Sequence, residues 1–251
     1  MTAMRYDIFP PEQAALLPEL APAKDLGYVL YGGTAVALRL GHRRSVDFDL
    51  FSDRPYIEHD RLAGHMPFLK DAQVVHMEED TLTYRTRGGV HVSFFSDLKL
   101  GRLGRPSMDD RGILMMASPL DLLATKCKVL LQRVEAKDYR DIAALLTSGL
   151  TLRQGIEGAM GIFGEAFPPF DAMRAMTWFE GGDLSSLGEK ERRILERSTE
   201  ELLREVMDMP LVPATIVSKS LSPRTSSDAH APTEREIRAL GLVEDPIEPP
   251  S

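Results

Sequence analysis

The fold of this chain is decided by one stretch, Tyr28-Val-Leu-Tyr-Gly-Gly-Thr-Ala-Val-Ala-Leu-Arg-Leu-Gly-His-Arg-Arg-Ser-Val-Asp-Phe-Asp-Leu-Phe51. The apolar run at residues 29–31 is long enough for one buried strand, and two glycines follow it at once. Residues 35–40 then favour a helix, and residues 46–51 favour a second strand. The stretch therefore predicts a strand, a glycine turn, a helix and another strand, in that order.

The paired glycines of this stretch suggest a phosphate site. Gly32 and Gly33 lack a Cβ, so the backbone can approach a ligand closely. The amides at the start of the following helix favour phosphate oxygens, and Thr34 adds a hydroxyl. Taken alone, a Gly-Gly pair is more often an ordinary turn.

Two carboxylates follow on the second strand. Asp47 and Asp49 are two residues apart, a spacing that puts both side chains on one face of a strand. They repel each other unless a cation lies between them, so they form a candidate Mg²⁺ clamp. An isolated Asp-x-Asp is more often a solvated strand edge. A phosphate cradle facing a metal clamp, however, suits a nucleoside triphosphate (NTP).

Composition limits the class of protein. A formal charge of −8 argues against a protein that coats nucleic acid, although a local basic groove for RNA remains compatible with it. Cys127 is the single cysteine and cannot form an intrachain disulfide, which fits a reducing compartment. No segment has the pattern of a signal peptide or a membrane span. We therefore expect a cytoplasmic protein.

The rest of the first 117 residues predicts further elements of an α/β core. An amphipathic helix beginning near Pro10 is weakened by Pro18 and Pro22. The remaining expectations are a helix at 56–66, strands at 74–77, 81–86 and 90–95, and a loop at 99–111.

A helix is predicted to begin at Ser118-Pro119, where serine caps and proline suits the first turn. Lys126 projects from the apolar face of this helix and needs a partner, either Asp47 or Asp49 or a triphosphate. The alternative is a lysine that extends to the helix edge and reaches water. Arg133 is expected on the same stripe two turns later.

Helical patterns continue to the end of the second part. They cover residues 137–149, 152–163, 171–180 and 189–207, and Trp178 is expected in the core. From residue 212 the chain is rich in proline and serine, which predicts a flexible tail with a short helix at 234–240. The expected domains are an α/β core at 1–117, a helical part at 118–211 that completes the site, and a tail at 212–251.

The order of the motifs resembles the nucleotidyltransferase superfamily of the DNA polymerase beta type. More narrowly, residues 32–35 and 42–51 resemble the AbiEii/AbiGii-type nucleotidyltransferase toxins. The resemblance implies a small mixed sheet followed by helices, and it implies that Ser45 supports the phosphates.

The same family has a second block of the form Lys…Arg…(Arg/Lys)-Asp-x-x-Asp. Lys126, Arg133 and Asp138 match it, which implies phosphate contacts for the two cations and positioning of nucleotide or substrate by Asp138. We expect Asp141 to be a helix-surface partner of Lys137.

One departure concerns a third carboxylate, which superfamily members usually carry on a neighbouring strand. His91 and Ser93 occupy the candidate positions here, and Glu79 and Asp97 are the candidates that could supply the missing charge. The resemblance implies a Mg²⁺-dependent enzyme that moves a nucleotide from an NTP to a hydroxyl of RNA (such as tRNA) or protein, with a cognate antitoxin as partner. The alternatives are a non-catalytic nucleotide-binding regulator and a small-molecule, drug-modifying nucleotidyltransferase.

Overall fold

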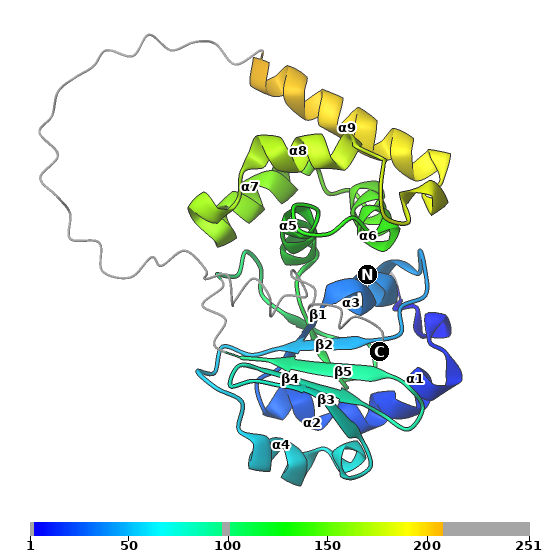
Figure 1. Cartoon of the computed structure of the whole chain (residues 1–251), viewed down its shortest axis with the longest axis vertical. Coiled ribbons are helices and arrows are strands. Elements are labelled where there is room, and N and C mark those ends of the chain that lie inside the picture. Colours follow the sequence, from blue (N-terminus) through cyan, green and yellow to red (C-terminus); the bar gives the residue numbers. More distant parts are fainter. Residues whose placement is uncertain (1–2, 97–100, 208–251) are drawn as a thin grey trace, which may run out of the picture.

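A seven-stranded mixed sheet forms one half of the molecule, and a group of helices forms the other (Figure 1). The computed structural model describes residues 3–96 and 101–207. The expected tail at 212–251, including the helix at 234–240, lies outside these residues. The α/β architecture expected from the sequence is confirmed.

The sheet has the strand order β3-β4-β5-β2-β1-β7-β6. Its strands are β1 (Val29–Tyr31), β2 (Phe48–Phe51), β3 (Gln73–Met77), β4 (Thr81–Arg85), β5 (His91–Phe95), β6 (Ser107–Met108) and β7 (Met115–Met116). β2 runs antiparallel to β1 and parallel to β5, so it lies at the centre. This register pairs Asp49 with Tyr31 on one side and with Ser93 on the other.

Short helices cover the sheet on the side away from the helical half (Figure 1). They are α1 (Pro11–Leu16), α2 (Pro22–Asp25) and α4 (His59–His65), with 3-10 turns η2 (Leu17–Leu20) and η3 (Pro67–Lys70), whereas the 3-10 turn η1 (Tyr6–Ile8) packs against α3. Pro18 and Pro22 each lie in the first turn of a new element, so the N-terminal helix is broken where prolines remove a donor. Leu17, Leu20 and Ala23 of this segment are buried in the core.

The helical half is built on α3 (Gly32–Leu40), which packs against β1 and β2 and also against α5 and α6. The other helices are α5 (Pro119–Val129), α6 (Ala136–Thr147), α7 (Leu152–Phe163), α8 (Pro169–Thr177) and α9 (Glu189–Met207), with turns η4 (Gly164–Ala166) and η5 (Leu184–Ser186). As expected, Ser118 caps the start of α5, and its Oγ accepts a hydrogen bond from the Asp121 amide at 3.1 Å. No helix within residues 3–96 and 101–207 is both long and apolar enough to cross a bilayer.

Three expectations about this architecture are wrong. The region 99–111 is not all loop, because β6 lies in it and pairs with β7, a strand that the sequence pattern missed. Arg133 is not on the stripe of α5, since that helix ends at Val129. Trp178 is 59% exposed rather than in the core, and the next residue, Phe179, packs against Tyr139 with ring centroids 6.2 Å apart.

Candidate active site

A cavity of about 280 Å³ opens where β1, the start of α3 and β2 meet α5. It brings together most of the residues that the sequence singled out, namely Gly32, Gly33, Ser45, Asp47, Asp49, Lys126 and Arg133. Thr34 and Asp138 do not line it. Arg43, Arg44 and Lys137 do line it, and their place there was not foreseen.

Gly32 lies between β1 and the acidic pair, and nothing larger than glycine fits there. Its φ is +68°, a left-handed conformation that other residues rarely adopt. A Cβ on Gly32 would stand 2.2 Å from Asp49 Oδ2, well inside van der Waals contact. The absent side chain therefore leaves room for the carboxylate of Asp49 at the cavity.

We expect Gly32→Ala to reduce nucleotide binding strongly. The left-handed conformation costs about 1–2 kcal/mol for a residue with a Cβ, and the clash would push Asp49 out of place. Gly89→Ala is a matched control, because Gly89 has φ +80° but no atom within 4 Å of its Cβ position. Calorimetric titration with an NTP and Mg²⁺, beside melting curves, separates the two effects. Equal behaviour of the two variants would contradict the role given to Gly32.

The first turn of α3 faces the cavity without a side-chain cap. The N-cap residue is Tyr31, and its side chain makes no capping hydrogen bond to the first amides. Uncapped amides at a helix N-terminus are a favourable environment for phosphate oxygens. A Cβ on Gly33 would lie 2.2 Å from Arg43 Nη2, so this glycine lets a guanidinium approach the same helix end.

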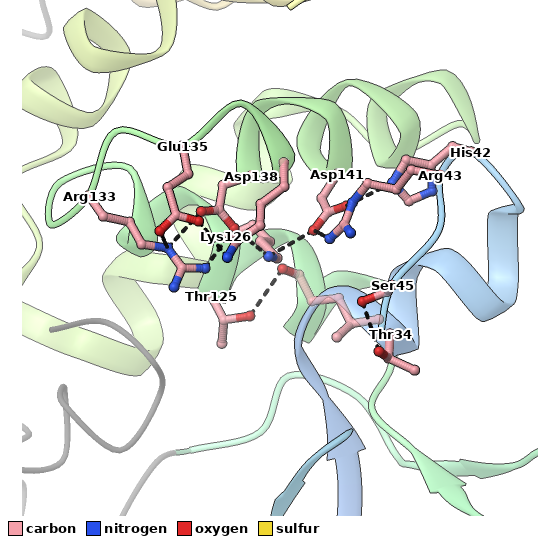
Figure 2. A network of polar contacts seen from close by, with 12 residues as sticks. Thr34, His42, Arg43, Ser45, Thr125, Lys126, Arg133, Glu135, Asp138 and Asp141 are labelled. Carbon is pink, nitrogen blue, oxygen red and sulfur yellow. Dashed lines mark hydrogen bonds and ion pairs between the residues drawn. The ribbon is translucent and has the colours of Figure 1, made fainter. Parts of the chain in front are cut away.

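Thr34 and Ser45 hold the loop that leads into β2, and only one of them lines the cavity. Thr34 is buried, and its hydroxyl donates to the carbonyl of Asp47 and lies 2.8 Å from Ser45 Oγ (Figure 2). Thr34 thus fixes the backbone that carries Asp47. Ser45 lines the cavity, whereas Thr34 does not.

The acidic pair is partly in place as expected. β2 begins at Phe48, so Asp47 precedes the strand instead of lying on it, yet both carboxylates line the cavity. Burial, together with the negative charge of Asp47, raises the pKa of Asp49 to about 6. A nearby cation would stabilise the ionised form of a carboxylate in this position.

No third carboxylate joins the pair within the residues that the structure describes. There, no group of three His, Cys, Asp or Glu side chains is arranged to hold a metal ion. Ser93 is the partner of Asp49 on β5, and its Oγ lies 3.0 Å from Thr83 Oγ1. Glu79 does not line the cavity, and Asp97 lies outside the described residues.

Lys126 has partners other than those expected. Its Nζ lies 2.5 Å from Asp138 Oδ1 and 2.8 Å from Asp141 Oδ2, and its side chain is 5% exposed (Figure 2). Neither Asp47 nor Asp49 is the partner, and the lysine does not reach water at the helix edge. Burial alone would lower the pKa of Lys126, but the two carboxylates outweigh it and raise the pKa, so the ammonium stays charged.

Asp141 is the main surprise, because the expectation of a surface partner for Lys137 is wrong. The carboxylate is fully buried and lies 2.7 Å from His42 Nε2, 2.6 Å from Arg43 Nε and 2.8 Å from Lys126 Nζ. Burial alone would raise its pKa, but these neighbours hold the pKa well below the usual range. Lys137 pairs instead with Glu135, at 2.5 Å.

Asp138 binds the second cation of the block. Arg133 Nε lies 2.8 Å from Asp138 Oδ2, and Arg133 Nη2 lies 3.1 Å from Asp138 Oδ1. Asp138 is fully buried, so it lies behind Lys126 and Arg133 while these cations line the cavity. Positioning of a nucleotide by Asp138 would therefore act through the two cations.

The chain was then compared with known proteins. A family model described as the nucleotidyl transferase AbiEii toxin of type IV toxin–antitoxin systems matches residues 15–215. The chain belongs to the AbiEii family. An uncharacterized protein of Aquifex aeolicus is 28% identical over 121 residues, which cover 47% of this chain and 57% of that relative.

The AbiEii match spans both halves of the molecule, so it includes the acidic pair and the cationic cluster behind the cavity. Sequence reasoning missed the link between these parts, which is made by His42 and Arg43 on one side and Asp141 on the other. The signal was present in the spacing of α6, where Asp138, Asp141, Ile142 and Leu145 recur on one buried face.

Proposed function

We propose that this AbiEii-family chain transfers a nucleotide from an NTP to a hydroxyl group of RNA (such as tRNA) or protein in the cytoplasm. The observation that carries the proposal is one cavity with three complementary parts. These are the acidic pair Asp47 and Asp49, the uncapped start of α3, and the cations Lys126 and Arg133. Because the family model describes a toxin of a type IV system, we also propose a cognate antitoxin as partner.

The donor set fits a hard divalent cation such as Mg²⁺. Asp47 has a half-exposed side chain that lies 3.4 Å from His91 Nδ1, and burial together with the negative charge of Asp47 raises the pKa of Asp49. Mg²⁺ typically takes one or two protein carboxylates and completes its shell with water and substrate phosphates, so two carboxylates suffice. A bound Mg²⁺ ion would neutralise negative charge on the phosphate oxygens.

The chain's own residues orient and neutralise the triphosphate. Amides of the first turn of α3 bind phosphate oxygens, and Lys126 and Arg133 stabilise the negative charge that collects on the leaving pyrophosphate. The Lys126 ammonium has three N–H donors, of which two point to Asp138 and Asp141, so one remains for a phosphate. Phosphoryl transfer depends mainly on such alignment and charge neutralisation.

A non-catalytic nucleotide-binding regulator is the second candidate, and one observation favours it. Ser93 stands beside Asp49 where the superfamily usually has a carboxylate. The two functions differ in outcome, because a regulator binds an NTP without consuming it.

The test is incubation of the purified chain with each of four α-labelled NTPs and Mg²⁺, with and without total RNA. Label in RNA or in protein supports transfer and identifies the acceptor class. Calorimetry run in parallel measures NTP affinity. Binding without incorporation into either acceptor would overturn the enzymatic proposal in favour of the regulator.

Lys126→Met is expected to weaken NTP binding by about 1–3 kcal/mol, the scale of one charge-assisted contact. Transfer should fall further, because the same charge stabilises the leaving group. Lys126→Arg is the control, since it keeps a cation against Asp138 and Asp141 and should restore part of the affinity. Unchanged NTP affinity in Lys126→Met, measured at a temperature at which the variant is folded, would remove Lys126 from the phosphate site.

A further inference from the structure

A second and larger cavity, of about 820 Å³, shares a wall with the candidate active site. The segment 130–135 after α5 forms that wall. It contributes Arg133 to the first cavity, and Gln132 and Val134 to the second. We call the second cavity the Trp178 groove; the lining residues used below are Lys128, Gln132, Val134, Arg174 and Trp178.

The groove holds a buried cation without a carboxylate partner and a buried carbonyl oxygen without a donor, among the described residues. Lys128 is 6% exposed; its ammonium donates to the carbonyl of Ala166 and lies 5.8 Å from the centroid of the Phe163 ring, but no carboxylate within the described residues pairs with it. Gln132 Oε1 is buried and accepts no hydrogen bond from the described residues. A buried cation and a buried carbonyl oxygen are both costly without partners. An occupant with a carboxylate and an N–H donor would satisfy both.

The rest of the groove offers apolar surface. Trp178 is 59% exposed and Val134 is 41% exposed, although both are residue types that favour burial. Arg174 stands at the same groove, where it pairs with Asp171 at 3.2 Å, and its side chain is 79% exposed. The groove therefore suits an extended peptide that combines acidic and apolar side chains.

The chain itself contains such a peptide. We propose that residues 242–250, Leu-Val-Glu-Asp-Pro-Ile-Glu-Pro-Pro, dock in the Trp178 groove. This segment has three carboxylates and no lysine or arginine, which complements the buried ammonium of Lys128. Its backbone amides can donate to Gln132, and its isoleucine and prolines can cover Trp178. Proline also restricts the backbone, which reduces the entropy lost on binding.

The groove is within reach of that segment. α9 ends at Met207 and packs against α8, which carries Arg174. If residues 208–241 behaved as a random chain, their ends would lie roughly 30–35 Å apart on average, a little more than the length of α9. Tethering at this length gives a local peptide concentration in the millimolar range, so even a weak contact is populated.

Docking has a consequence for the first cavity, because the peptide rests against the segment 130–135. That segment contains Arg133, so a peptide bound in the groove restricts the motion of this side chain at the first cavity. The docking does not depend on nucleotide transfer, and its test needs no enzymatic readout.

Trp178 is the single tryptophan of the chain, so its fluorescence reports on the groove directly. The full chain is compared with a full-length variant that carries Glu244→Gln, Asp245→Asn and Glu248→Gln. If the segment docks through its carboxylates, the variant shows red-shifted Trp178 emission and at least about twofold stronger quenching by acrylamide. Arg174→Gln, which removes an exposed cation of the groove, shifts emission in the same direction.

The matched control is a full-length variant with Glu234→Gln and Glu236→Gln, which neutralises acids outside the proposed segment and leaves emission unchanged. Identical quenching of the wild type and the triple variant overturns the proposal, as does an equal effect of the control variant. A wild-type signal that depends on protein concentration also overturns it, because the groove would then be filled by another molecule.

Discussion

Replacing Asp47 and Asp49 together with asparagine is expected to abolish nucleotide transfer while the protein stays folded. The two carboxylates are the anionic side of the cavity, and asparagine keeps their shape without their charge. Loss of metal-assisted charge neutralisation is worth several kcal/mol, so transfer should fall by at least about 1000-fold. Folding should not suffer. Because the pKa of Asp49 is raised to about 6 in the folded chain, ionisation of this carboxyl costs folding stability above that pH, and asparagine removes the cost.

The measurements are label incorporation and melting temperature with and without NTP and Mg²⁺. Ligands that bind the folded state raise the melting temperature, so this shift should appear in the wild type and vanish in the double variant. Asp60→Asn with Asp71→Asn is the control, since both residues are exposed and outside the cavity. Transfer at the wild-type rate by the Asp47/Asp49 variant would rule out the metal clamp.

Asp141→Asn is expected to cause the largest loss of stability, about 3–5 kcal/mol, the usual cost of breaking a buried ion pair from one side. The substitution leaves Lys126 and Arg43 without the carboxylate that they share. Both cations line the cavity, so NTP binding should weaken as well. Urea denaturation gives the stability, and Glu201→Gln, which removes an exposed ion pair with Arg197, should change it little.

The pH dependence of that loss provides a second check. The neighbouring cations lower the folded-state pKa of Asp141 below its unfolded value of about 3.9. The ionised Asp141 therefore stabilises the fold fully at pH values above its unfolded-state pKa. This stabilisation is lost as the pH falls toward its folded-state pKa. The gap in stability between the wild type and Asp141→Asn should narrow below about pH 4. A gap that does not change between pH 7 and pH 3 would show that the lost contacts are not ionic.

Local chemistry made much of this fold predictable. The order of strand, glycines, helix and strand is confirmed because each element is specified by neighbouring residues, such as Gly32 with its positive φ. The start of α5 is confirmed for the same reason, since Ser118 caps it. The short edge strands β6 and β7 were missed because two residues are too few to show an alternating pattern.

The partners of charged residues were not predictable in the same way. Lys137 and Asp141 have the spacing of an exposed helical ion pair, yet Asp141 binds His42 and Arg43 from a distant part of the chain. Trp178 was expected in the core on the strength of its size, but Phe179 takes the inner position against Tyr139. Which of two adjacent residues is buried, and which partner a charged residue takes, depends on tertiary packing that a local sequence pattern does not contain.

The contact between Arg43 and Asp141 also bears on biosynthesis. Nearly a hundred residues separate the two partners, and contacts of such long range form only after the intervening chain has been made. During translation the sheet residues that carry the acidic pair leave the ribosome well before α6 does. A nascent chain of this protein therefore lacks the cationic wall of its cavity until synthesis has passed residue 141.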